Sequence, residues 1–363
     1  MSCTAGYLKQ ARRASLPGGG VTGGNLDRRE LLAAALAGEP TPRFPVLGPG
    51  GLINVVTREV LDRFGIPLPA AHYSGVMMAE LAAAAYDMAG FDNVGVPLCL
   101  TVEAGVLGAR VDMGDGMVMP RIVAFPGSTP EEIVSNAVPA LLNHGRVPQV
   151  LRAMELLREM RPGAPVIGNM AGPATLASSL IRPSMMIDLV KRDPGFLNHL
   201  LEGIVSFLCA YAEAMVERGA DIIMIHEPAG RSGSYLGFDL FLNVLPYLNE
   251  VSRYAHLGGA KLILHLCGGR MEQVRMCRET DMDAYSFEAE VDPGEAREIL
   301  GKPIVGTVPA SLVHYFPPEM VLEETLMAVS RGAAMMTPPC GLGLDTPFQN
   351  LRIMKEASHR FRV

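Results

Sequence analysis

Short apolar runs alternate along the chain with segments of helical apolar spacing. The runs begin near residues 44, 94, 164, 221, 261, 283, 303 and 333, and a segment with apolar residues every three or four positions follows each of them. Eight strand–helix units in succession predict a (β/α)8 TIM barrel. The alternative is an open doubly wound sheet, but no Gly-x-Gly-x-x-Gly turn follows the first strand.

A helix is predicted to precede the barrel. It begins after Asn25 or Asp27, which can cap it, runs to Ala37, and ends at Gly38. We therefore expect residues 25–363 to form a single catalytic (β/α)8 barrel with an N-terminal helical extension. Residues 1–24 are rich in glycine and in small polar or basic residues, so we expect a flexible arm there.

The remaining helices follow from the same spacing. An alanine-rich segment predicts a helix over 76–88, and residues 112–120 suggest a small hairpin. Further helices are predicted at 148–160, 196–218, 239–257, 271–280, 293–300 and 318–331, with a closing helix from Phe348.

Composition narrows the functional classes. The chain has 363 residues, of which 49% are hydrophobic and 19% charged, so a large core is expected. The net charge of −7, without a long basic run, gives no support for nucleic-acid binding. No apolar run approaches the ~18 residues of a membrane span, and no secretory signal is seen. Six irregularly spaced cysteines do not suggest a disulfide framework, which favours a reducing cytoplasm.

The segment 261–269, Lys-Leu-Ile-Leu-His-Leu-Cys-Gly-Gly, carries the clearest chemistry. Alternate residues of a strand share a face, so His265 and Cys267 should emerge side by side at the strand end. Imidazole nitrogen and thiolate sulfur are ligands that zinc prefers. Near the C-terminus, another apolar stretch ends in Cys340 and Gly341. We therefore predict a metal site, against the alternative of a buried histidine and ordinary core cysteines.

Other unusual polar residues also fall at predicted strand ends, where TIM barrels place their working groups. They are Glu103, Asn169, His226, Glu227 and Glu288. Glu227 is interpreted as a pocket carboxylate, with capping of a helix N-terminus as the alternative. Glu103 is equally consistent with a salt bridge, and Asn169 with a helix cap.

With these residues laid out, the chain resembles the uroporphyrinogen decarboxylase superfamily over about residues 25 to 360, and within it the zinc-dependent methylcobamide:coenzyme M methyltransferases. The landmarks are Thr-Val-Glu-Ala at 101–104, Gly-Pro-Ala-Thr-Leu-Ala at 172–177, Leu-His-Leu-Cys-Gly at 264–268, Ser-Phe-Glu at 286–288 and Cys-Gly at 340–341. The His-x-Cys…Cys pattern separates this branch from the decarboxylases.

The resemblance implies a zinc-dependent methyltransferase with His265, Cys267 and Cys340 as Zn²⁺ ligands. It also implies Glu288 as a catalytic and displaceable fourth ligand. The methyl group would pass between a methylcobalamin-type corrinoid and a small-molecule acceptor, either a thiol such as coenzyme M or tetrahydrofolate. A separate small corrinoid-binding protein is expected as partner, because no Asp-x-His-x-x-Gly run is present. No nucleic-acid or membrane partner is expected, and a homo-oligomer is left open.

The chain departs from the family pattern at two loops. Gly306-Thr307 stands where a Gly-Asn pair is common, and His226-Glu227-Pro228 stands where Asp-Pro is common. We expect these positions to face the pocket and to bear on the acceptor. The first loop, Gly48-Pro49-Gly50-Gly51, lacks the arginines that hold propionate groups in the decarboxylases. A metal-free decarboxylase or lyase and a non-catalytic zinc barrel that binds a corrinoid protein are the alternatives.

Overall fold

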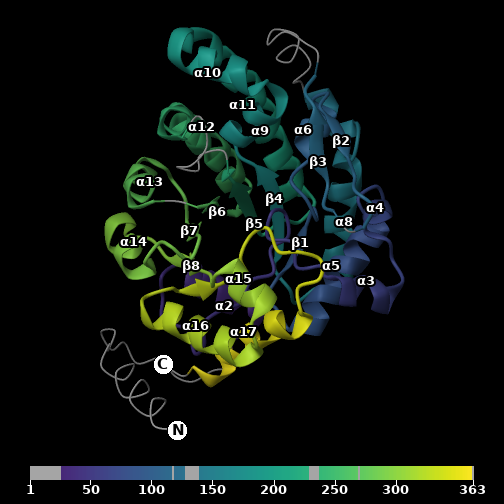
Figure 1. The fold of residues 1–363 in the computed structure, drawn as a ribbon, viewed down its shortest axis with the longest axis vertical. Coiled ribbons are helices and arrows are strands. Elements are labelled where there is room, and N and C mark those ends of the chain that lie inside the picture. Colours follow the sequence, from purple (N-terminus) through teal and green to yellow (C-terminus); the bar gives the residue numbers. More distant parts are fainter. Residues whose placement is uncertain (1–25, 117, 127–138, 229–236, 269, 362–363) are drawn as a thin grey trace.

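A computed structural model describes residues 26–116, 118–126, 139–228, 237–268 and 270–361. The arm expected at residues 1–24 lies outside the described residues. Seven parallel strands form one sheet in the order in which they occur along the chain. They are β1 (Val94–Val96), β4 (Val166–Ala171), β5 (Ile222–His226), β6 (Lys261–Leu266), β7 (Ala284–Phe287), β8 (Ile304–Gly306) and β9 (Met335–Met336). Figure 1 shows the sheet curled on itself inside a ring of helices, which is the expected α/β barrel.

The predicted first strand, at residues 43–48, is reduced to a single bridge. Val46 pairs with Met336 of β9, and Leu47 donates a backbone hydrogen bond to the carbonyl of Met336. On the other side, the N–H of Asp92, just before β1, donates to the carbonyl of Val46. The segment thus closes the barrel between β9 and β1 without forming a ladder. Pro45 has no N–H to donate, and Pro49 follows shortly, so the two prolines disfavour a longer ladder here.

The helices form the outer layer. They are α2 (Arg28–Leu36), α3 (Arg58–Phe64), α4 (Leu68–Ala71), α5 (Gly75–Ala89), α6 (Val102–Val106), α8 (Val147–Met160), α9 (Pro173–Leu180), α10 (Pro183–Arg192), α11 (Pro194–Glu217), α12 (Gly237–Leu257), α13 (Met271–Met276), α14 (Pro293–Leu300), α15 (Ala310–Tyr315), α16 (Pro318–Ser330) and α17 (Phe348–Arg360). Two 3₁₀ helices, η1 (Pro139–Asn143) and η3 (Cys277–Glu279), and an antiparallel hairpin of β2 (Arg110–Asp112) and β3 (Arg121–Ala124) complete the description.

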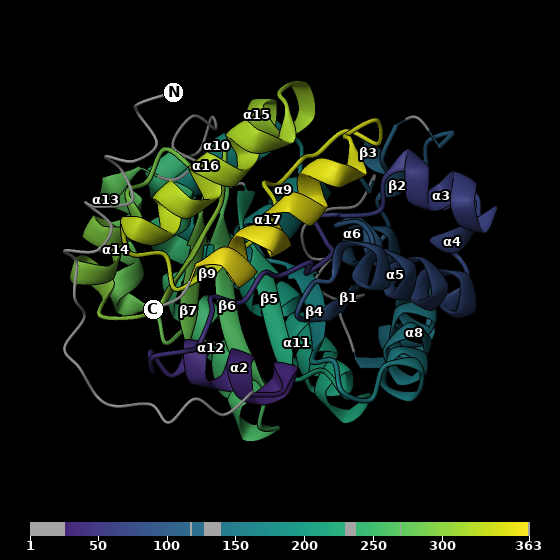
Figure 2. The ribbon, with the colours of Figure 1, turned by 90° about the horizontal axis from the view of Figure 1, so that it is seen from below.

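Helix α2 closes one end of the barrel. The Asp27 side chain accepts hydrogen bonds from the N–H groups of Arg29 and Glu30, and the Glu30 carboxylate accepts from the N–H of Asp27. This capping box fixes the start of the helix. The apolar side of α2 then packs into the barrel interior with Leu47 of the closing segment and with residues from the strands, which are Ile167, Ile222, Met224, Ile263, Ala284, Val305 and Met335. Figure 2 shows α2 at the end of the barrel opposite α15.

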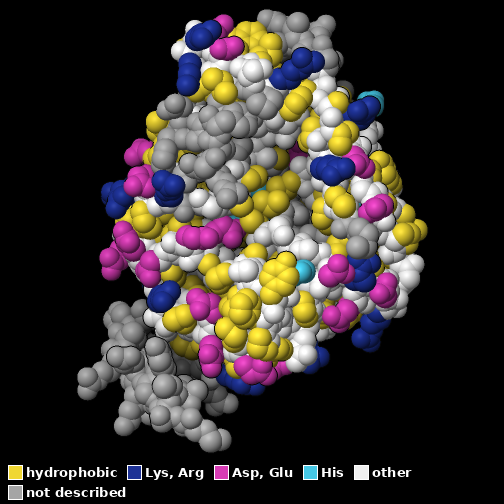
Figure 3. Space-filling model, viewed as in Figure 1, with side chains coloured by type: hydrophobic (Ala, Val, Ile, Leu, Met, Phe, Trp, Pro, Cys, Tyr) yellow, Lys and Arg dark blue, Asp and Glu magenta, His cyan; other side chains and the backbone are white. Residues whose placement is uncertain are grey.

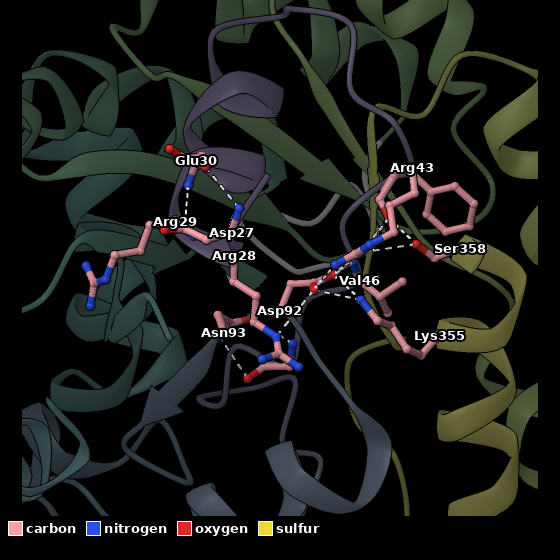
Figure 4. Close-up of polar contacts among 12 residues, drawn as sticks. Asp27, Arg28, Arg29, Glu30, Arg43, Val46, Asp92, Asn93, Lys355 and Ser358 are labelled. Atoms are coloured by element: carbon pink, nitrogen blue, oxygen red, sulfur yellow. Dashed lines mark hydrogen bonds and ion pairs between the residues drawn. The ribbon is translucent and has the colours of Figure 1, made fainter. Parts of the chain in front are cut away.

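A buried carboxylate fastens the closing segment to the rest of the barrel. Asp92 is fully buried and accepts from Arg43 at 2.7 and 2.8 Å, from Lys355 of α17 at 2.6 Å, and from the N–H of Val46 at 2.8 Å. Arg28 of α2 lies 3.8 Å away (Figure 4). Burial opposes ionisation, but the hydrogen bonds and charges of Arg43 and Lys355 lower the pKa of Asp92. The cluster therefore joins helices α2 and α17 to the closing segment at residues 43–48 and to the residues that precede β1.

Helix α11 is long and apolar enough to cross a membrane by length and composition alone. Most of this stretch is buried within the protein, where α11 packs on α9 and α12. It is therefore a core helix of the barrel, as the periodic pattern over 196–218 predicts.

Candidate metal centre

Four side chains converge at the carboxyl ends of three strands. His265 is in β6 and Cys267 directly follows it, Glu288 follows β7, and Cys340 lies in the turn after β9. One potential ligand atom from each lies within 4.8 Å of all the others. The Cys267 and Cys340 Sγ atoms are 3.2 Å apart, and Cys340 Sγ is 2.8 Å from Glu288 Oε1. The structure thus brings together all four residues that the sequence suggests as ligands.

The local backbone presents the two cysteines in the same way. Gly268 follows Cys267 with φ +61°, and Gly341 follows Cys340 with φ +69°. Both values lie in the left-handed region that favours glycine. The chain therefore turns away immediately after each cysteine and leaves its side chain at the strand end.

His265 is oriented to offer one ring nitrogen to the cluster. Its Nδ1 lies 3.0 Å from Ser286 Oγ, in the neighbouring strand β7. Its Nε2 is buried, has no hydrogen-bond partner among the described residues, and lies 3.6 Å from Glu288 Oε1. A histidine that binds a metal through one ring nitrogen usually forms a hydrogen bond through the other. One imidazole, two thiols and a carboxylate with an orphaned Nε2 fit a zinc ion, which prefers nitrogen and sulfur donors.

The electrostatics of the cluster also favour a cation. Burial raises the pKa of Glu288, while the neighbouring His265 acts in the opposite direction. The adjacent Cys267 thiol and burial raise the pKa of Cys340, and the Glu288 charge adds to this rise. The side chains of Cys267, Cys340 and Glu288 all become anions when they ionise, and negative charges this close together repel one another. A divalent cation would remove that penalty and deprotonate the thiols.

A polar layer continues the site around the barrel interior. His226 of β5 is in register with His265 of β6, and Asn169 of β4 lies two residues before Ala171, the register partner of His226. His226 Nε2 lies 2.8 Å from Asn169 Oδ1, and the rings of His226 and His265 are 5.4 Å apart at 63°. Burial lowers the pKa of His226 well below its usual value. His226, one of the residues expected to contact a substrate, therefore lies beside the metal-ligand cluster, and Asn169 contacts His226.

Glu227 lies at a helix N-terminus. Its carboxylate accepts hydrogen bonds from the N–H of Ala174 at 3.0 Å, from the N–H of Thr175 at 2.6 Å, and from the Thr175 hydroxyl. A Cβ at Gly172 would lie 2.3 Å from Glu227 Oε2, so only glycine leaves room for this cap. Burial raises the pKa of Glu227 to about 7, and the three donors oppose that rise. Both carboxylate oxygens of Glu227 therefore cap the N-terminus of α9. This arrangement corresponds to the helix-capping alternative rather than to a carboxylate in the pocket.

Glu103 and Gly306 are the other two residues that the sequence suggests for substrate binding. Glu103 is buried in α6, and its Oε1 accepts from the N–H of Ala171 at 3.0 Å while its Oε2 has no partner among the described residues. Burial raises the pKa of Glu103 to about 7. A Cβ at Gly306 would lie 2.7 Å from the Ala333 Cβ, so this glycine permits close packing of β8.

A second buried polar cluster was missed by sequence reasoning. Cys99 Sγ lies 3.2 Å from Arg146 Nη1 and 3.4 Å from Thr101 Oγ1. Burial opposes ionisation, but the neighbouring His72 and the charge of Arg146 lower the pKa of Cys99 to about 6. The pattern Cys-x-Thr after a strand is the only local signal, because His72 and Arg146 are remote in sequence and carry no motif.

Helix α15 lies at the end of the barrel where the carboxyl ends of the strands are found. Figure 3 shows this face hollowed near its centre, with acidic and hydrophobic side chains around the hollow. Tyr315 and Phe316, at the end of α15, are among the exposed large hydrophobic residues of the described chain.

Known proteins resemble this chain over nearly its whole length. The model of the uroporphyrinogen decarboxylase (URO-D) family matches residues 27–361. Methylcobamide:CoM methyltransferase MtaA of Methanosarcina barkeri is 30% identical over 337 residues, which cover 91% of this chain and 97% of the relative. A uroporphyrinogen decarboxylase of Thermus thermophilus is 24% identical, over 90% of this chain and 96% of the relative.

A solved structure agrees with these relatives. A methyltransferase from Methanosarcina mazei superposes with a TM-score of 0.85 and 28% sequence identity. The alignment covers 93% of this chain and 99% of that protein. The barrel described here is therefore the fold of that methyltransferase.

Proposed function

The chain belongs to the uroporphyrinogen decarboxylase family and is a methyltransferase, and we propose that it transfers a methyl group between a protein-bound methylated corrinoid and a small nucleophile held at a zinc site. The observation that carries this proposal is the convergence of His265, Cys267, Cys340 and Glu288 within 4.8 Å. The similarity to enzymes named for methylcobamide and CoM supports the choice of methyl donor and acceptor class.

In this proposal His265, Cys267 and Cys340 are the firm ligands and Glu288 is the one that yields. A catalytic zinc site keeps one exchangeable position, and a carboxylate is a harder donor than a thiolate. When bound, the zinc supplies a Lewis acid that keeps an acceptor thiol, whose unperturbed pKa is near ~8.5, ionised at neutral pH. Ser286 holds the His265 ring through Nδ1, so that Nε2 faces the cluster.

The methyl donor is proposed to arrive on another protein. The sequence lacks the Asp-x-His-x-x-Gly run typical of corrinoid carriers, so a small corrinoid-binding protein would present its cofactor at the hollow face seen in Figure 3. The acceptor is proposed to be a small thiol, the class to which the CoM in the relatives' names belongs, and tetrahydrofolate is the alternative. None of the cysteines in the described part of the chain forms a disulfide, which supports the proposal of a reducing cytoplasm.

The experiment is an anaerobic absorbance assay with zinc-loaded protein, methylcobalamin and a panel of thiol, folate and amine acceptors. Methylcobalamin can replace the protein-bound corrinoid because the ring carries the reactive bond. We expect demethylation that requires an acceptor and is faster with thiols than with amines. A loaded zinc site that demethylates nothing, even with a corrinoid protein supplied, would leave only the role of a non-catalytic partner.

A further inference from the structure

The hydrogen bonds of Asn169 determine which nitrogen of His226 carries a proton. Asn169 Nδ2 donates to the carbonyls of Pro49 at 2.5 Å and Val96 at 3.1 Å. Only the nitrogen of an amide can donate to carbonyls, so Oδ1 is the atom that faces His226 Nε2 at 2.8 Å. An amide oxygen only accepts hydrogen bonds. His226 therefore carries its proton on Nε2.

The other ring nitrogen is then a buried acceptor without a donor. His226 is fully buried, and Nδ1 has no hydrogen-bond partner among the described residues. An imidazole away from water and without a paired carboxylate is neutral, and with the proton on Nε2 its Nδ1 has a free lone pair. Buried acceptors of this kind are uncommon in native proteins, and a hydrogen-bond donor from a ligand or a water molecule normally completes them.

The ring is held rigidly beside the candidate metal centre. His226 in β5 is in register with His265 in β6, and the two rings meet edge to face at 5.4 Å. On the other side, Gly51 has φ +61°, and a Cβ there would lie 2.7 Å from His226 Nε2. The ring is thus confined between Gly51, Asn169 and His265, and its lone pair has a fixed direction.

We propose that His226 Nδ1 accepts a hydrogen bond from the methyl-acceptor molecule and so determines acceptor specificity. This inference rests on the proposed function and narrows it. The acceptor would be a small thiol that carries an N–H or O–H group beside its sulfur. A sulfonate can only accept hydrogen bonds and an alkyl group makes none, so neither completes the His226 lone pair. Because the His226 ring is buried, the donor group must be small enough to reach it beside His265.

The test compares short thiols of similar size with zinc-loaded protein and methylcobalamin. Those with a donor are 2-aminoethanethiol and 2-mercaptoethanol, and those without are propane-1-thiol and 2-mercaptoethanesulfonate, which is coenzyme M itself. A site built to hydrogen-bond a substrate group rejects analogues that lack it, so we expect kcat/KM about tenfold higher for the donor thiols. Calorimetric Kd values, measured without methylcobalamin, should show the same order.

Two variants separate recognition from structure. His226→Gln keeps an N–H near the Nε2 position for Asn169 but has no acceptor at Nδ1, so the preference for donor thiols should disappear. His226→Asn places an amide oxygen near Nδ1 and loses the bond to Asn169, so much of the preference should remain despite lower stability. Zinc content should be unchanged in both variants.

The outcomes distinguish this inference from the proposed function. Demethylation with equal rates for donor and non-donor thiols, or a preference that survives in His226→Gln, would overturn the role of His226 and mean that the lone pair binds only water. Failure of every thiol, folate and amine acceptor would instead reject the proposed function.

Discussion

The Sγ atoms of Cys267 and Cys340 lie 3.2 Å apart, although 73 positions separate the two residues in the sequence. One stands at the end of β6 and the other in the turn after β9, so the closure of the barrel is what brings them together. Neither thiol is fully buried, and the carboxylate of Glu288 lies beside Cys340. We propose that this thiol pair shares a cation with the neighbouring imidazole nitrogen of His265.

Cys267→Ala should therefore lose bound zinc without unfolding the protein, because the barrel core does not include this side chain. We expect zinc content to fall from one ion per chain to none, and the stabilisation of the natural protein by added zinc to vanish. Cys277→Ala is the matched control, since Cys277 is a buried cysteine of η3, in contact with Tyr285 of β7 and outside the cluster. Its zinc content should stay at one per chain. Full zinc content in Cys267→Ala would remove Cys267 from the ligand set.

Glu288→Gln should keep its zinc and turn over more slowly. We expect His265, Cys267 and Cys340 to hold the ion without the carboxylate. At the exchangeable position a neutral amide would replace the carboxylate, and we expect kcat to fall about tenfold. Metal analysis and the methylcobalamin assay on the same preparation check both parts. Glu290→Gln changes an exposed carboxylate two residues away and should be silent. Complete loss of metal in Glu288→Gln would make Glu288 a structural ligand.

Glu227→Gln should weaken the fold rather than the metal site. The natural carboxylate accepts three hydrogen bonds at the N-terminus of α9, whereas an amide must turn one N–H group toward those donors. We expect the free energy of unfolding in urea to fall by about 1–3 kcal/mol. Glu272→Gln, in the exposed first turn of α13, is the control. An unchanged free energy together with an altered KM would instead make Glu227 a substrate-binding residue.

Asp92→Asn should destabilise the protein by about 3–5 kcal/mol at pH 7, because it leaves Arg43 and Lys355 without their buried anion. The folded-state pKa of Asp92 is lowered. Its contribution is therefore fully present above the unfolded value, near ~3.9, and is lost as pH falls through the folded value. Urea unfolding at pH 7 and pH 3 should show a smaller acid loss in the variant than in the natural protein.

Asp345→Asn removes an exposed partner of Arg58 and serves as the control for that experiment. It should leave unfolding at both pH values unchanged. If the acid loss of stability were the same in Asp92→Asn and in the natural protein, other carboxylates would be responsible for it.

The sequence predicted the candidate ligands because they depend on local rules. His265 and Cys267 share a face through the period of two in a strand, and Glu288 and Cys340 directly follow short apolar runs. Parallel strands in sequential order place all their carboxyl ends on one face of the barrel. Once the alternation of strands and helices is recognised, the meeting of these side chains follows.

Other features depend on contacts that no local pattern encodes. The segment at Val46 forms a single bridge because prolines flank it. Its pairing partner, Met336, is remote in the sequence, so no local pattern reveals the pairing. The helix α15 is only six residues long, too short for a periodic signal. Glu227 follows a strand end like the ligands do, but the room left at Gly172 directs it to α9. The pairing of Cys99 with Arg146 joins two segments that only the folded barrel brings together.

The measurement that tests the central claim most directly is the rate of acceptor-dependent methylcobalamin demethylation during zinc titration of metal-free protein. The rate should rise in proportion to added zinc, reach a plateau at one ion per chain, and stay at background throughout the same titration of Cys267→Ala. Full activity in metal-free protein, or equal activity in Cys267→Ala, would contradict a zinc-dependent methyltransferase built on His265, Cys267, Cys340 and Glu288.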